Sequence, residues 1–171
     1  MEKGPGEAIT IGESKFGKGI FAAKDLSPGN VLMKITGTPL SFEDTIALGN
    51  KESHSMQIGL HDYILVEPPF LYSNHSCDPN CGINENLELI AIRPVSKGEE
   101  LTWDYSTSML ERHWTMKCHC GSERCRGIVK DFDRLPKAIQ DEYLQQKIVL
   151  SFIVPTLQKR PETIHEAIGV K

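Results

Sequence analysis

The chain has 171 residues, of which 39% are hydrophobic and 25% are charged, and its formal net charge is −4. This length suits one domain with a sizeable core, and the composition is ordinary for a globular protein. The negative charge argues against binding to nucleic acid through phosphate contacts, although an acidic face can attract Lys- and Arg-rich protein tails. No apolar run approaches the roughly 20 residues needed to cross a bilayer, and the N-terminus lacks an apolar signal-peptide segment.

The first half of the chain is interrupted by glycine and proline, which predicts short strands rather than long helices. Each candidate strand carries β-branched or apolar residues between turn signals. Ser41 precedes segment 42–48, which is typical of a short helix with a capping serine. The expected strands are residues 8–12, 19–23, 31–35, 54–58, 62–66, 87–92 and 100–105.

After Cys125 the pattern of apolar residues changes to a helical one. Leu135, Ile139 and Tyr143 fall at helical spacing, and Pro136 suits the first turn of a helix. The sequence therefore predicts a helix over roughly 135–150.

The apolar run 148–154 is short and is followed by Pro155. We interpret it as the end of a helix or a buried edge, and as a candidate surface for a homodimer. Beyond it, residues 158–171 are polar and are expected to be loose.

Three of the five cysteines, Cys118, Cys120 and Cys125, are spaced Cys-x-Cys-x4-Cys. Thiolates at this spacing can converge on one metal ion and leave one corner of a zinc tetrahedron open. The spacing alone leaves both Cys77 and Cys81 open as the fourth ligand. Because the cysteines are odd in number and clustered, they favour a metal site over a disulfide framework, and hence a reducing intracellular compartment.

Four motifs follow one another along the chain: Gly17-Lys18-Gly19, the string NHSCDPN at 74–80, the string ELTWDY at 100–105, and the cysteine cluster at 118–125. Their order resembles the SET-domain family of S-adenosylmethionine-dependent protein-lysine methyltransferases, and the cysteine cluster resembles the family's post-SET zinc segment. The resemblance covers roughly residues 8–127.

The resemblance implies a mainly β fold with few helices. Several small curved sheets would form a SET-type β-clip with a pseudoknot, followed by a post-SET zinc site and a C-terminal helix. The implied division is a SET domain over 8–110, a post-SET zinc segment over 114–130 and a C-terminal helical tail over 131–171.

The first two motifs offer groups that suit S-adenosylmethionine. Glycine lets a backbone approach a ligand closely, while asparagine and neutral histidine each offer a donor and an acceptor for an ammonium or an adenine edge. Taken alone, the Gly-x-Gly favours a hairpin turn and the histidine a place in the core. Leu71 stands where the family often has arginine. The cofactor contacts that the resemblance implies are Lys18, Gly19, Ile20, Tyr72, Asn74, His75 and Tyr105.

The third motif supplies the residue expected to be catalytic. A lysine amine has a pKa of about 10.4, so only about one in 2,500 is neutral at pH 7, and a narrow apolar channel lowers the cost of freeing it. The resemblance implies that Tyr105 orients the amine and the sulfonium. It also implies that Tyr63 lies beside the lysine channel, although an ordinary strand tyrosine is as good an interpretation. Trp103 replaces the usual Phe or Tyr, so it either crowds the substrate channel or rotates away.

The resemblance implies Cys77 as the fourth ligand of a structural zinc ion. The expected function is methyl transfer to a lysine of a protein, such as a histone tail, without direct binding to nucleic acid or membrane. The alternatives are a non-catalytic zinc-stabilised SET-like binding module, and a methyltransferase for another acceptor such as free lysine. Nucleus, bacterial cytosol and secreted effector all stay open as locations, and a homodimer stays open as an assembly.

Overall fold

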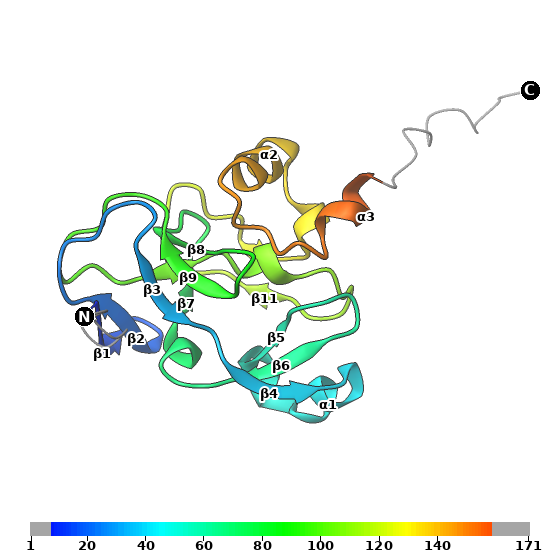
Figure 1. Cartoon of the computed structure of the whole chain (residues 1–171). Coiled ribbons are helices and arrows are strands. Elements are labelled where there is room, and N and C mark those ends of the chain that lie inside the picture. The colour runs from blue at the N-terminus through cyan, green and yellow to red at the C-terminus, as the bar shows by residue number, and fades with distance from the viewer. Residues whose placement is uncertain (1–7, 159–171) are drawn as a thin grey trace, which may run out of the picture.

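The computed structural model describes residues 8–158, and short strands in small sheets dominate it (Figure 1). The prediction of a mainly β fold with few helices is confirmed. β1 (Ile9–Ser14) and β2 (Gly17–Ala22) form an antiparallel hairpin near the N-terminus. The strand after the turn begins at Gly17, whose φ of 100° is a conformation that glycine adopts without strain.

Two antiparallel sheets of three strands form the middle of the molecule. Side chains alternate between the two faces of a strand, and in β9 Leu89 and Ala91 are the ones that point into the core. The first sheet has the order β4 (Gly37–Leu40), β6 (Tyr63–Val66), β5 (Ser55–Gln57), and the second has the order β3 (Val31–Lys34), β9 (Glu88–Ala91), β8 (Cys81–Ile83).

Two further strand pairs join segments that are far apart in the chain. β7 (Asn74–His75) pairs in parallel with β10 (Thr102–Trp103), so the second and third motifs lie side by side. β11 (Met116–Lys117) pairs with β12 (Ile128–Val129) on either side of the cysteine cluster. These two-residue strands are too short to produce a periodic sequence pattern, which is why β7, β11 and β12 were not predicted.

The helices are short and lie mostly at the surface. α1 (Phe42–Ala47) begins with the predicted cap, because Ser41 and Asp44 satisfy each other's backbone groups in a capping box. Among residues 8–158, no helix is long and apolar enough to span a membrane. The remaining helices are α2 (Lys137–Gln145), α3 (Val154–Gln158) and the 3-10 turns η2 (Gly49–His54), η3 (Phe70–Tyr72), η4 (Tyr105–Ser108) and η5 (Phe132–Arg134).

α2 is shorter than the predicted 135–150. It ends because Lys147 adopts a left-handed φ of 58°, and the N–H of Ile148 then donates to the carbonyl of Tyr143 at 3.2 Å. The N–H of Lys147 donates to the carbonyl of Leu144 at 3.1 Å, which completes a Schellman-type end. The chain leaves the helix there and turns back toward β8.

Apolar residues of the C-terminal part form a second core beside the sheets. Ile148 and Ile153 are buried in it, and Leu150 reaches the main core. The interpretation of 148–154 as a buried edge holds for these three residues, whereas Val149, Phe152 and Val154 are half-buried. A homodimer through this run stays a prediction. The predicted loose segment falls almost wholly on 159–171, which lies outside the described residues.

Gly82 of β8 is the closest point of contact between the sheets and the C-terminal part. A Cβ placed there would lie 2.3 Å from Cγ2 and 2.6 Å from Cβ of Ile148. We expect Gly82→Ala to lower the free energy of unfolding by about 1–3 kcal/mol, because the crowded atom is next to the backbone and cannot rotate away. Denaturant unfolding of Gly82→Ala, alone and combined with Ile148→Gly, which removes both crowded carbon atoms, measures this. A cost for Gly82→Ala that persists when Ile148 is truncated would contradict the explanation.

Candidate functional site

The site is built around the parallel pair of β7 and β10. The N–H of Ser76 donates to the carbonyl of Trp103 at 3.1 Å and extends the pairing. On the other side, the amide of Asn80 donates to the carbonyl of Glu100 at 2.8 Å and accepts from the N–H of Thr102 at 2.9 Å. Asn80 thus replaces a strand partner for the segment that leads into Tyr105.

Tyr105 is fixed by hydrogen bonds at both ends. Its hydroxyl donates to the carbonyl of Ser73 at 2.8 Å, and its backbone N–H donates to Nδ1 of His75 at 3.2 Å. Its ring lies 4.8 Å from the ring of Trp103 and 6.4 Å from that of Trp114. Burial and the nearby carboxylate of Glu100 hold the pKa of Tyr105 well above its ordinary value, so the phenol is neutral at physiological pH.

Two pockets meet at Tyr105. We call the first the aromatic pocket, since its walls include Met56, Phe70, Trp103, Tyr105 and Trp114. The second, the polar pocket, is lined by Lys18, Tyr72, Asn74, His75 and Tyr105, and the Met116–Cys120 segment closes one side of it. Tyr105, Leu71 and Ser53 line both pockets, so a group bound in one lies next to a group bound in the other.

The polar pocket contains most of the residues predicted to contact the cofactor. The Nδ2 of Asn74 donates to the Lys18 carbonyl at 3.1 Å and to Glu100 Oε1 at 2.7 Å, which leaves its Oδ1 as the acceptor for a ligand. The ammonium of Lys18 lies 4.9 Å from the centre of the Tyr72 ring.

Two of the predicted cofactor contacts, Gly19 and Ile20, do not line the polar pocket. Gly19 lies behind it: a Cβ there would be 2.6 Å from Glu100 Oε1 and 2.9 Å from the Ser14 Cβ. Glycine therefore lets the β1–β2 hairpin approach the ELTWDY segment closely. Ile20 is fully buried in the main core, and its carbonyl accepts from the N–H of Leu101 at 2.8 Å. Contact of Gly19 and Ile20 with the cofactor stays a prediction.

Trp103 forms part of the wall of the aromatic pocket. Its Nε1–H donates to Ser73 Oγ at 2.8 Å, and its ring packs 5.4 Å from Phe70. Of the two orientations expected for this residue, the structure shows the one facing the pocket.

Tyr63 is not among the residues that line the aromatic pocket. It lies buried in β6 with its ring 5.9 Å from Phe42, and it is hydrogen-bonded to Glu111, which does line the pocket. A direct role for Tyr63 in the reaction stays a prediction.

Four sulfur atoms converge next to the polar pocket. The Sγ atoms of Cys77, Cys118, Cys120 and Cys125 all lie within 4.8 Å of one another. Those of Cys77 and Cys118 are 3.7 Å apart, close to the edge of about 3.8 Å that four Zn–S bonds of about 2.3 Å give a tetrahedron. The donor set and its spacing thus fit a zinc ion. Cys81 lies elsewhere, in β8 within the main core, where burial raises the pKa of its thiol to about 12.

His75 connects this cluster to Tyr105. Burial lowers the pKa of His75 to about 4, so its ring is neutral at pH 7. Since Nδ1 accepts from the N–H of Tyr105, the proton lies on Nε2, which is 3.3 Å from Cys77 Sγ and donates to it. If Cys77 binds zinc as a thiolate, its sulfur would accept this hydrogen bond, as metal ligands do from their outer partners.

Comparison with known proteins gives this arrangement a family. The family model described as the SET domain matches residues 17–106, more than half of the chain. The chain belongs to the SET-domain family.

Relatives with curated names support this. Histone-lysine N-methyltransferase 2D of Homo sapiens is 31% identical over 128 residues, which cover 64% of this chain and 2% of the human protein. Histone-lysine N-methyltransferase ash1 of Drosophila melanogaster is 35% identical over 143 residues, which cover 71% of this chain and 6% of the fly protein. This SET-domain chain therefore matches only a small part of each of these relatives.

Solved structures support the fold. One, from work on the product specificity of histone lysine methyltransferases, has a TM-score of 0.57 at 22% identity and covers 70% of this chain and 54% of that one. Another, an active polycomb repressive complex 2 in its basal state, has a TM-score of 0.51 at 22% identity and covers 57% of this chain and 15% of that one.

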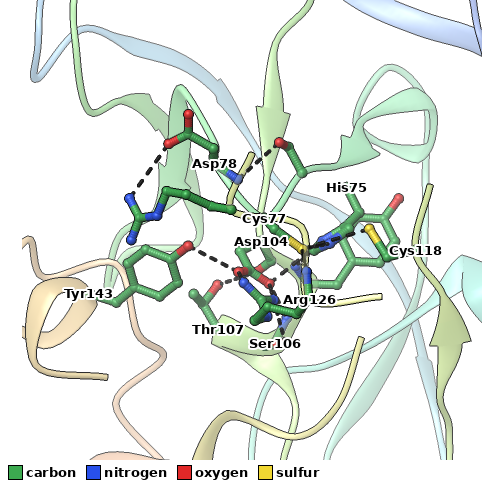
Figure 2. Close-up of polar contacts among 12 residues, drawn as sticks. His75, Cys77, Asp78, Asp104, Ser106, Thr107, Cys118, Arg126 and Tyr143 are labelled. Atoms are coloured by element: carbon green, nitrogen blue, oxygen red, sulfur yellow. Dashed lines mark hydrogen bonds and ion pairs between the residues drawn. The ribbon is translucent and has the colours of Figure 1, made fainter. Parts of the chain in front are cut away.

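Sequence reasoning missed several residues that hold this SET-domain site together. Ser73 binds Tyr105 through its carbonyl and Trp103 through its hydroxyl. Asp104 is buried beneath Tyr105, and Arg126 and Tyr143 both bind its carboxylate (Figure 2). Asp104 was visible only as part of the ELTWDY motif, and nothing in the sequence pairs it with residues of the C-terminal part.

The buried tyrosines predict a loss of stability at alkaline pH. Burial raises the pKa of Tyr63 to about 12 and also raises the pKa values of Tyr105 and Tyr143. Above about pH 10 the unfolded chain releases phenol protons that the folded chain keeps, so the free energy of unfolding falls as pH rises. This contribution is complete below pH 10 and is lost as pH passes the folded pKa.

Urea unfolding at steps between pH 9 and pH 12 measures this loss. Over that range the free energy of unfolding of Tyr63→Phe should fall by up to about 2 kcal/mol less than that of wild type, because the variant lacks this phenol and its ionisation. Equal losses in the two proteins would mean that Tyr63 ionises at its ordinary pKa.

Proposed function

We propose that this chain transfers the methyl group of S-adenosylmethionine to the Nε of a lysine in a protein and releases S-adenosylhomocysteine. The observation that carries the proposal is the position of Tyr105, where the aromatic and polar pockets meet. A reaction between two separately bound molecules needs such a shared boundary.

In this proposal the polar pocket holds the cofactor. The side-chain Oδ1 of Asn74 and the backbone near Lys18 suit the amino-acid end of the cofactor. Tyr72 and His75 complete the wall of the pocket. Gly19 and Ile20 act by holding the β1–β2 hairpin close to the ELTWDY segment. S-adenosylmethionine supplies an electrophilic methyl on a sulfonium.

The aromatic pocket would hold the lysine. Aromatic faces accept its alkyl stem, and removal from water disfavours the ammonium, which lowers the cost of freeing the lone pair. Once the proton has left to solvent, the lone pair forms the new N–C bond while the C–S bond breaks toward sulfur. Tyr105, neutral and anchored to Ser73, orients the amine and is not a general base. Trp103 narrows the pocket on one side, which favours the addition of fewer methyl groups.

The zinc ion in this proposal is structural. Cys77, Cys118, Cys120 and Cys125 would fill all four positions, so no water is bound for chemistry. The site fastens the post-SET loop against the end of β7, next to His75. The proposed division is thus 8–110 for the SET domain and 114–130 for the post-SET zinc segment, with 131–171 as the C-terminal part.

The acceptor proposed is a histone tail, since the named relatives are histone-lysine methyltransferases, and such an acceptor would place the chain in the nucleus. The test incubates purified protein with methyl-labelled S-adenosylmethionine and, separately, core histones, a protein extract or free lysine. Label on lysine, blocked by excess S-adenosylhomocysteine, is the expected result. Label in the extract alone would point to a different protein acceptor. A folded protein that binds zinc but transfers no label to histones, extract or free lysine would overturn the proposal and favour a binding module.

A further inference from the structure

The carboxylate of Asp104 lies buried next to the site, and both of its oxygen atoms are bound by other groups of the protein. Its side chain has no exposed surface. Oδ1 accepts from the N–H of Ser106 at 3.1 Å and from Nη2 of Arg126 at 2.9 Å. Oδ2 accepts from the hydroxyl of Tyr143 at 3.0 Å and lies 2.7 Å from Nη1 of Arg126, an ion-pair contact. A buried carboxylate without such hydrogen-bond partners would cost free energy on folding.

Two of these partners, Arg126 and Tyr143, come from parts of the chain that the family match does not include. The SET match ends at residue 106, whereas Arg126 lies in the cysteine loop and Tyr143 in α2. Figure 2 shows the Tyr143 hydroxyl and the Arg126 guanidinium pointing at the same carboxylate. The segment that follows Cys125 and helix α2 therefore both contact Asp104, a residue of the ELTWDY motif.

Asp104 fixes the backbone of the turn that begins at the next residue, Tyr105. Its carboxylate caps η4, the turn whose first residue is Tyr105. The carbonyl of Thr107, on the same turn, accepts from the N–H of Leu150 at 3.1 Å. A change in the angle of this cap would move the Tyr105 hydroxyl relative to the Ser73 carbonyl, which is what fixes its direction.

A second contact joins α2 to the zinc loop at the surface. Arg124 donates to Glu142 at 3.2 and 2.6 Å, and both side chains are 39% exposed. Exposed pairs contribute little to stability, so this contact holds α2 in place far less than the buried one does. It provides a matched control, because Glu142 is the neighbour of Tyr143 on the same helix.

We infer that Tyr143 of α2, together with Arg126, is a positioning residue for the reaction: the C-terminal helix sets the orientation of Tyr105 through the carboxylate of Asp104. This rests on the proposed methyl transfer. Tyr143 lines neither pocket, so it acts on bound molecules only through Asp104 and Tyr105.

The test compares Tyr143→Phe with Glu142→Gln in the full chain. Phenylalanine fills the same buried space and removes only the hydroxyl. We expect kcat of Tyr143→Phe to fall about tenfold, as for the loss of one hydrogen bond to a charged group, with KM for both substrates within about twofold of wild type. Glu142→Gln should retain wild-type kcat and KM.

A readout without catalysis separates this inference from the proposed function. The chain has two tryptophans, Trp103 and Trp114, and both line the aromatic pocket next to Tyr105. Tyr143→Phe should change their fluorescence emission or its quenching by acrylamide, while Glu142→Gln should not. If wild type transfers no methyl, the proposed function fails, and the fluorescence still decides the inference. Tyr143→Phe with a lower melting temperature but unchanged kcat and emission would show a purely structural role and overturn it.

Discussion

Replacing Tyr105 with phenylalanine is expected to lower kcat for methyl transfer by at least about 100-fold while the protein stays folded. The hydroxyl is held at 2.8 Å from the Ser73 carbonyl, at the boundary of the two pockets. Without it, the amine loses the hydroxyl that is proposed to direct its lone pair toward the methyl group. A displacement of about 1 Å between reacting groups can by itself cost about 100-fold.

The same substitution should affect stability only modestly. The ring that packs against Trp103 and His75 remains, and a single neutral hydrogen bond contributes about 1 kcal/mol. Single-turnover transfer of labelled methyl, with cofactor binding measured by calorimetry on the same preparation, separates the two effects. A Tyr105→Phe protein that binds cofactor and transfers methyl at more than a tenth of the wild-type rate would show that the hydroxyl does not orient the amine.

The motifs predicted those parts of the site that lie within one short stretch of chain. Asn74 and His75 are neighbours, so a single motif carries both into the polar pocket. Gly19 was also found by its motif, but its part is different: it lets the hairpin approach Glu100 closely. The motifs therefore predicted which residues lie at the site. The contact that each residue makes could be seen only in the folded structure.

Contacts between distant segments could not be predicted. Asp104 is 22 residues from Arg126 and 39 from Tyr143, and neither partner stands in a motif that points to a carboxylate. The end of α2 was missed for a local reason. Lys147 adopts the left-handed conformation that a glycine usually marks, so the sequence offered no stop signal where the helix ends.

The cysteines of the candidate metal site show that spacing along the chain cannot identify the fourth ligand. Three cysteines within ten residues predicted a metal site, but Cys77 and Cys81 lie at similar distances from them along the chain. The structure separates the two, because Cys77 follows β7 at the site whereas Cys81 is a residue of β8 paired with Ala91. The chain turns between β7 and β8, which leaves Cys77 beside the other three cysteines and places Cys81 in the main core.

The two cysteines therefore provide a matched pair for the metal. Zinc binding by four-ligand peptides is worth about 10–16 kcal/mol, or roughly 2.5–4 kcal/mol for each ligand, so Cys77→Ser should weaken zinc binding by about 100- to 1,000-fold. Cys81→Ser should retain about one zinc per chain, although it places a hydroxyl in an apolar core and lowers stability. Zinc content after dialysis against a weak chelator, measured by mass spectrometry of the metal, tests both.

Loss of zinc from Cys77→Ser should also weaken cofactor binding. The Met116–Cys120 segment closes the polar pocket, and the apolar cluster against which it packs is small, with Met109 and Val129 as its buried members besides two of the cysteines. Without the metal, Cys118 and Cys120 are no longer joined to Cys77 after β7, so chelation of the wild-type protein should weaken cofactor binding in the same way. Full zinc content in Cys77→Ser, or unchanged cofactor affinity after the metal is removed, would contradict a structural zinc at this position. Because Cys81→Ser is destabilised for an unrelated reason, only loss of the metal site explains a defect confined to Cys77→Ser.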